Sequence, residues 1–104
     1  MPAVVLGNFV AALAMTLDWL LSAYFLVVLV AALVTWVNPD PRNPIVRFLY
    51  AVTEPVLAWI RQRLPFVCAG GIDFSPLVLL VVIRFAQWFL VRSLFELAVQ
   101  LGAR

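Results

Sequence analysis

The side chains that could do chemistry in this chain are few, and their types narrow what that chemistry is. The 104 residues include seven arginines and five carboxylates, with no lysine and no histidine, and Cys68 is the single cysteine. The sequence has no nucleophile with a base beside it, no glycine-rich phosphate loop and no acidic cluster with metal-ligand spacing. One cysteine also allows no disulfide within the chain. We therefore expect no enzyme activity, no metal and no cofactor.

The charges of the central stretch recur at a regular interval. Arg47, Glu54 and Arg61 lie seven residues apart, so they would share one narrow stripe of a helix. Apolar side chains cover most of the remaining circumference, a pattern typical of a helix at a membrane interface with its arginines toward the headgroups. The predicted sites of contact with lipid or with a partner are Arg47, Glu54, Arg61, Arg63 and Arg84.

Arg84 differs from the other arginines because it interrupts a long apolar stretch. Counted from Pro76 at about 1.5 Å per residue, it lies about 12 Å into that stretch if the stretch is helical. A charge at that depth either snorkels to the headgroups or faces a partner or a cavity. Its candidate partners are Glu54 and a group on another molecule.

A second pair of charges is expected near the opposite ends of the two apolar stretches. Asp18 lies 18 residues before Trp36, and Arg92 lies 16 residues after Pro76. The two side chains therefore reach similar levels if both stretches are helical, which makes Asp18 and Arg92 a possible interhelical pair. Snorkelling to the interface is the alternative for each, and Arg92 can also pair with Glu96 along its own helix.

Two long apolar stretches must position these side chains. The chain is 66% hydrophobic and 12% charged, whereas a soluble domain has about 25% charged residues. Residues 3–37 carry only one charge, and about 20 apolar residues suffice to cross a bilayer. We predict an all-α membrane protein that forms a single unit, residues 1–104, with two transmembrane helices joined by a proline-framed loop containing interfacial amphipathic helices. Its predicted parts are a span at about 19–37, a loop at 38–75 and a span at about 76–100.

Proline and glycine mark the boundaries within the loop. In "NPDPRNP" the prolines end the first helix and predict a stiff turn. Pro55 is expected to split the amphipathic segment in two, with Thr53 capping the second piece. In "CAGGIDFSP" the two glycines permit a tight turn, Ser75 is a good N-cap, and Pro76 suits the first position of the second span.

The distribution of arginine predicts how the chain is oriented. Four arginines fall in the loop, and the positive-inside rule places such a loop in the cytoplasm and both termini outside. The first residues lack the basic region of a cleaved signal peptide, so we expect the first apolar segment to stay in the mature protein. The predicted location is the inner (plasma) membrane, with more than one crossing. The arginines that count for this orientation are Arg42, Arg47, Arg61 and Arg63.

Several short motifs follow one another between Trp36 and Arg84. After Trp36 they are Asn43-Pro44, Thr53-Glu54-Pro55, Arg61 with Leu64-Pro65, and Gly71-Asp73-Ser75-Pro76. In this order they resemble the YggT (YlmG) family of small integral membrane proteins. Some members of that family contain two copies of this unit, and the present sequence contains one.

The resemblance implies a non-enzymatic role in the membrane. Bacterial members of the family are tied to cell division, membrane organisation and osmotic tolerance, and plastid relatives to nucleoid distribution and haem attachment to a b-type cytochrome complex. Our first hypothesis is therefore assembly or organisation of a membrane complex. The expected partners are membrane lipid and either another protein or further copies of the chain. Direct nucleic-acid binding is not expected, because the basic residues form no clustered face.

Two alternatives stay open at this point. The chain could be a transport or osmotic-response component that forms a polar path as a homo-oligomer, with Arg84 lining the path. It could instead be a structural subunit of a larger energy-transducing complex. The second alternative predicts a partner and no active site, as the assembly hypothesis does, so the sequence does not separate these two.

Overall fold

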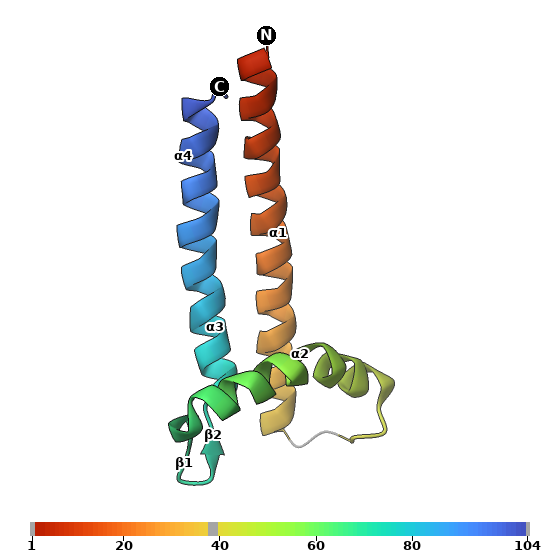
Figure 1. Cartoon of the computed structure of the whole chain (residues 1–104). Coiled ribbons are helices and arrows are strands. Elements are labelled where there is room, and N and C mark those ends of the chain that lie inside the picture. Colours follow the sequence, from red (N-terminus) through yellow and green to blue (C-terminus); the bar gives the residue numbers. More distant parts are fainter. Residues whose placement is uncertain (1, 38–39, 104) are drawn as a thin grey trace. The chain divides into compact units, whose positions relative to one another are not determined.

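The structure is a computed structural model that describes residues 2–37 and 40–103. It is largely helical, as predicted (Figure 1). Asn38 and Pro39, which begin the predicted proline turn, lie outside the described residues. In chain order the elements are α1 (Pro2–Trp36), α2 (Pro44–Arg63), the 3₁₀-helix η1 (Pro65–Val67), the short strands β1 (Cys68–Ala69) and β2 (Ile72–Asp73), α3 (Ser75–Ala86), the π-helix η2 (Gln87–Val91) and α4 (Arg92–Gln100).

Two helices are long and apolar enough to cross a membrane by length and composition. They are α1, with 35 residues and a mean hydropathy of 2.3, and the continuous helix Ser75–Gln100, with 26 residues and 1.9. The segment before Asp18 extends α1, which was one of the two outcomes expected for it. Both helices carry large exposed apolar side chains, among them Phe9, Trp19 and Phe85.

The chain divides into two compact units. Unit 1 consists of Met1–Ala23 and Ile83–Arg104, and unit 2 of Tyr24–Val82. In unit 1 the start of α1 packs closely against the last helix. A Cβ added at Gly7 would lie 2.4 Å from the backbone nitrogen of Ala103 and 2.8 Å from the carbonyl oxygen of Ala98. Glycine at position 7 thus permits a backbone approach that any side chain would block.

In unit 2, α2 supplies the largest share of the apolar core, to which Val67 of η1 also contributes. One face of α2 is buried at intervals of three and four residues, the period of a helix. Val28 and Ala31 of α1 and Leu79 of α3 complete this core. The buried residues of α2 are Val46, Leu49, Thr53, Leu57 and Ile60.

The start of α2 is fixed by Asn43 and Pro44. The Asn43 side-chain oxygen accepts the backbone N–H of Ile45 at 2.9 Å, which makes Asn43 the N-cap, and Pro44 occupies the first turn. The prediction that Pro55 splits this helix is wrong, because α2 runs through it. Proline removes one backbone hydrogen bond there, but the buried face continues on both sides of it. Thr53 consequently caps nothing, and its buried hydroxyl donates to the carbonyl of Leu49 at 2.8 Å.

A tight hairpin joins η1 to the second long helix. Strands β1 and β2 pair antiparallel, with Cys68 opposite Asp73. Gly70 and Gly71 between them have φ of 63° and 79°, the left-handed values that a two-residue type I′ turn requires. The glycine turn expected from the sequence is therefore present.

The second long helix begins differently from the expectation. Ser75 was predicted as its N-cap, but the helix already includes Ser75. The first helical hydrogen bond runs from the N–H of Val78 to the carbonyl of Phe74 at 3.1 Å. The side chain that accepts a free backbone N–H is that of Asp73, whose Oδ1 lies 2.9 Å from the Ser75 nitrogen. Asp73 takes the role expected of Ser75 because its longer carboxylate reaches the N–H from outside the helix.

Candidate functional site

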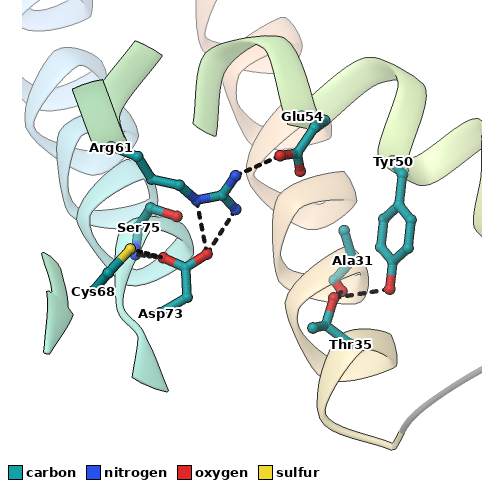
Figure 2. Close-up of polar contacts among 8 residues, drawn as sticks. All are labelled: Ala31, Thr35, Tyr50, Glu54, Arg61, Cys68, Asp73 and Ser75. Carbon is teal, nitrogen blue, oxygen red and sulfur yellow. Dashed lines mark hydrogen bonds and ion pairs between the residues drawn. The ribbon is translucent and has the colours of Figure 1, made fainter. Parts of the chain in front are cut away.

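The most connected polar group of unit 2 surrounds Arg61, in the last turn of α2. Its Nε donates to Asp73 Oδ2 at 2.9 Å, its Nη2 lies 2.6 Å from the same oxygen, and its Nη1 binds Glu54 Oε1. Figure 2 shows the guanidinium between the two carboxylates. Glu54 reaches it because seven residues are two turns of helix, and Asp73 reaches it from the end of β2. We call Glu54, Arg61 and Asp73 the Arg61 network.

Burial opposes the charges of the Arg61 network, and its internal contacts outweigh that effect. Burial alone would raise the pKa of Asp73, but contacts with Ser75 and Arg61 hold that pKa below its ordinary value. Burial would lower the pKa of Arg61, but Glu54 and Asp73 raise it above its ordinary value. At neutral pH Arg61 and Asp73 are therefore both charged.

A pair of hydroxyl groups lies near this network, also in unit 2. The Thr35 hydroxyl donates to the carbonyl of Ala31 at 2.9 Å and lies 3.0 Å from the Tyr50 hydroxyl (Figure 2). A threonine hydroxyl has one hydrogen to donate. Since Ala31 takes it, Tyr50 is the donor to Thr35, and the lone pairs of its own oxygen remain available as acceptors.

A cavity of about 670 Å³ in unit 2 connects the hydroxyl pair with the Arg61 network. One part of its wall is apolar and comes from α1 and α2, and the other part is polar. A cavity of this volume is within the usual range for small-ligand sites. The apolar part of the wall includes Val28, Ala31 and Leu57, and the polar part includes Tyr50, Glu54 and Arg61.

Unit 1 has a polar group of another kind, centred on Gln87 in the π-helix η2. The Gln87 amide nitrogen donates to Ser22 Oγ at 2.8 Å and to Asp18 Oδ1 at 3.0 Å, and its amide oxygen accepts from Arg84 Nη1 at 3.1 Å. The Gln87 side chain is buried, with 5% of the residue exposed. Single turns of π-helix are often found at functional sites. We call Asp18, Ser22, Arg84 and Gln87 the Gln87 cluster.

The structure pairs two predicted partners differently. Asp18 and Arg92 were expected to form an interhelical pair, but Asp18 accepts from Gln87, and Arg92 Nε lies 3.6 Å from Glu96 Oε1 on its own helix. Arg84 contacts Gln87, and its candidate partner Glu54 binds Arg61. The neutral amide of Gln87 reaches Asp18 and donates to its carboxylate, so Asp18 has a hydrogen-bond partner other than Arg92.

The other predicted contact residues are not brought together. Arg47 is exposed on α2, and Arg63 is exposed with its guanidinium carbon 5.2 Å from the centre of the Trp59 ring. Among the residues that the structure describes, no three histidine, cysteine or acidic side chains are grouped to hold a metal ion. Of the predicted contact residues, the structure joins Glu54 and Arg61, together with Asp73 at the end of β2.

The predicted site residues did not include Gln87, Tyr50 or Thr35. Gln87 had a signal, because it is a polar amide within a long apolar stretch, where such a group must find hydrogen-bond partners. Tyr50 and Thr35 had none, since 15 positions separate them in two different helices. Only the packing of α2 against the end of α1 brings their hydroxyls together.

The sequence matches the model of a known family. A family model described as CCB3/YggT matches residues 10–94. The chain belongs to the CCB3/YggT family. The matched region includes most of both long apolar helices, all of α2 and the whole Arg61 network. The residues matched by the family model therefore include both the Arg61 network and the Gln87 cluster.

Relatives in several bacteria share part of this sequence. The protein named YggT from Escherichia coli strain K12 is 42% identical over 59 residues, which are 57% of this chain and 30% of the relative. A protein of the proC 3′ region of Vibrio alginolyticus is 38% identical over 66 residues, 64% of this chain and 34% of the relative. A Haemophilus influenzae protein is 37% identical over 68 residues, 65% and 36%. The chain thus spans about a third of the length of these YggT relatives. No solved structure matches it.

Proposed function

We propose that this chain is a non-enzymatic integral membrane protein that acts in the assembly or organisation of a membrane complex. The observation that carries the proposal is a second apolar stripe on α2, beside its buried face. The residues of this stripe recur at helical spacing and are exposed, from 69% at Ile45 to 37% at Val56. A contiguous apolar surface of this kind marks a site of contact with lipid or protein. We call it the exposed stripe of α2, formed by Ile45, Phe48, Val52, Val56 and Trp59.

The two long helices support a location in the inner (plasma) membrane. Their apolar side chains are mostly exposed in the chain alone, which suits helices surrounded by lipid. We propose that both cross the membrane, that α2 lies at the interface with its exposed stripe toward lipid or a partner, and that the loop faces the cytoplasm. The bias of arginines toward the loop supports that orientation.

The polar groups support a non-enzymatic role. The charges of the Arg61 network are engaged with one another, and the Gln87 cluster is a set of mutual hydrogen bonds. The Cys68 thiol lies 3.7 Å from Asp73 Oδ1, but the lowered pKa of Asp73 makes this carboxylate a weak base for activating a nucleophile. Such internally bonded groups fit a role in holding a surface in shape, which is what an assembly factor or a structural subunit needs.

Crosslinking in native membranes tests this proposal. A photoreactive amino acid at Phe48, on the exposed stripe, is compared with the same group at Arg47. Arg47 is the preceding residue of α2 and is exposed outside the stripe. We expect reproducible crosslinks from position 48 to a different protein and few from position 47. Crosslinks only between copies of the chain, or only to lipid, would overturn the assembly role. Release of the chain from membranes by alkaline carbonate would overturn its integral location.

One observation favours a second candidate, a transport or osmotic-response component. The Gln87 cluster lies in apolar helices beside a cavity of about 550 Å³ that is also lined by Arg92 and Glu96. Polar side chains within membrane-crossing segments often mark the path of an ion or solute. Under this candidate, Arg84→Gln abolishes solute flux through proteoliposomes and leaves oligomer formation intact. Flux that is unchanged in Arg84→Gln, or absent in the native chain, contradicts it.

A further inference from the structure

We propose that the cavity of unit 2 binds the headgroup of a phospholipid that carries a primary amine, with the protonated amine bound by Glu54. This inference rests on the membrane location proposed above. Three features of the cavity support it: the charge of the Arg61 network, the free acceptor atoms and the apolar wall.

The Arg61 network leaves one negative charge uncompensated. Two carboxylates, Glu54 and Asp73, share the single guanidinium of Arg61. The other charged side chains of unit 2, Asp40, Arg42, Arg47 and Arg63, do not line the cavity. Because opposite charges attract more strongly where water is partly excluded, the cavity favours a ligand with a positive group.

The uncompensated charge is available at Glu54. Both oxygens of Asp73 are engaged, Oδ2 by Arg61 and Oδ1 by the Ser75 N–H and, at 3.7 Å, by the Cys68 thiol. Glu54 uses Oε1 to bind Arg61. Within residues 2–37 and 40–103, Glu54 Oε2 accepts no hydrogen bond, and the Glu54 side chain is 53% exposed.

A second acceptor lies one helical turn away. Tyr50 precedes Glu54 by four residues on α2, with its hydroxyl directed to Thr35 while the Glu54 carboxylate is directed to Arg61 (Figure 2). Because Tyr50 donates its hydrogen to Thr35, its oxygen faces the cavity as an acceptor. A protonated primary amine has three N–H donors and no acceptor. It can therefore donate to Glu54 and keep its remaining donors for water or for another acceptor of the cavity wall.

The apolar wall accounts for the lipid part of the ligand. Val28, Ala31 and Leu57 are buried apolar residues that border the cavity, and Ala32 continues this wall along α1. Small side chains on α1 leave room for the first carbons of an acyl chain. The two N–H groups of Arg61 that bind neither carboxylate are the donors open to the phosphate beside the amine. An anionic lipid without an amine would bring its charge against Glu54 with nothing to offset it.

The test uses the full chain purified in a mild detergent and lipids that differ only in the headgroup. Retention of each lipid is measured by native mass spectrometry, and the rise in Tm on lipid addition is measured in parallel. The series starts with phosphatidylethanolamine and adds one, two and three N-methyl groups, which removes N–H donors while the positive charge stays. Phosphatidylglycerol is the anionic comparison, and water-soluble glycerophosphoethanolamine lacks the acyl chains.

We expect retention to fall with each methyl group and to be weakest for phosphatidylglycerol. Glu54→Gln should lower the preference for ethanolamine over choline headgroups about tenfold, because a charge-assisted hydrogen bond is lost. Glu96→Gln, an exposed acid in unit 1, is the matched control and should leave the preference unchanged.

Three results would overturn the proposal. They are equal retention of all four amine headgroups by the native chain, an unchanged preference in a folded Glu54→Gln variant, and equal binding of the water-soluble headgroup. The N-methyl series on the native chain decides the question even if Glu54→Gln fails to fold. The failure of the proposed function can be recognised separately, because it would appear as release from membranes or as missing crosslinks.

Discussion

The two units contain their polar groups in different ways. In unit 2, Arg61 is bound by two carboxylates, and the group keeps a surplus charge. In unit 1, Arg84 contacts the neutral amide of Gln87, which also satisfies Asp18. In unit 2, the acids that neutralise Arg61 come from α2 and β2. In unit 1, the amide of Gln87 bonds to a cation and an anion at once and adds no charge. The Arg61 network thus holds two acids for one guanidinium, whereas Asp18 and Arg84 of unit 1 both bond to Gln87.

The apolar contacts of the two units differ as well. Unit 1 depends on a backbone approach at Gly7 that leaves no room for a side chain. Unit 2 depends on the side chains of one buried face of α2. Substitutions can therefore be chosen to affect one unit and leave the other unchanged. Hydrogen exchange of peptides from each unit reads the two responses separately.

The largest effect is expected at Gly7. Gly7→Leu should lower the stability of unit 1 by about 3 kcal/mol, because added side-chain atoms would collide with backbone of the last helix. Hydrogen exchange should speed up in residues 2–23 and 92–103 and stay the same in α2. The control is Ala12→Leu, which adds similar volume at an exposed position. If exchange in unit 1 is as slow as in the native chain, the close approach at Gly7 does not exist.

Removing the amide of Gln87 should have the next largest effect. Gln87→Leu leaves Asp18 and Arg84 without this hydrogen-bond partner, at a cost of about 2 kcal/mol. The thermal unfolding midpoint measures the loss, and the faster exchange should again be confined to unit 1. Gln100→Leu, the same replacement at an exposed site, should change little. Equal midpoints for the two variants would show that the Gln87 cluster contributes nothing to stability.

Arg61→Met is the corresponding change in unit 2. It leaves the carboxylates of Glu54 and Asp73 without their shared cation, and we expect a loss of about 1 kcal/mol because the side chains are partly exposed. Faster exchange in residues 44–63 is the readout. Arg63→Met at the same end of α2 provides the control. The comparison fails if Arg63→Met has the larger effect or if the faster exchange occurs in unit 1.

Acid should also affect unit 2 through Asp73. The pKa of this carboxyl is lowered in the folded chain from its ordinary value of 3.8. Its contribution to stability is therefore fully present above about pH 4 and is lost as the pH falls through the lower folded value. Thermal midpoints are measured from about pH 6 down to about pH 2. As the pH falls, they should decrease more steeply for the native chain than for Asp73→Asn. Parallel curves would contradict a lowered pKa.

The smallest effect is expected for the exposed pair on α4. Arg92→Gln removes an ion pair between neighbouring turns of one helix, which is worth about 0.3 kcal/mol. The thermal midpoint at low salt should barely move, and added salt should erase the difference. A loss comparable with that of Gln87→Leu would mean that Arg92 makes a contact beyond Glu96, such as the expected one with Asp18.

The sequence by itself determined the two long apolar helices, the glycine turn and the family. Long apolar runs make helices because the backbone must satisfy its own hydrogen bonds, and two adjacent glycines reach positive φ without strain. The sequence also placed Glu54 and Arg61 on one stripe of a helix, but it offered Glu54 as a partner of Arg84 and not of Arg61. Each of these features depends on residues close together in the chain.

The tertiary structure decided what lies across elements. Whether Pro55 breaks α2 depended on the apolar face that its neighbours bury, and the choice of Gln87 over Arg92 as the partner of Asp18 depended on how two helices are in register. Asp73 meets Arg61, and Tyr50 meets Thr35, only after α2 has packed. Local propensity carries no information about such register, because side-chain packing between elements sets it.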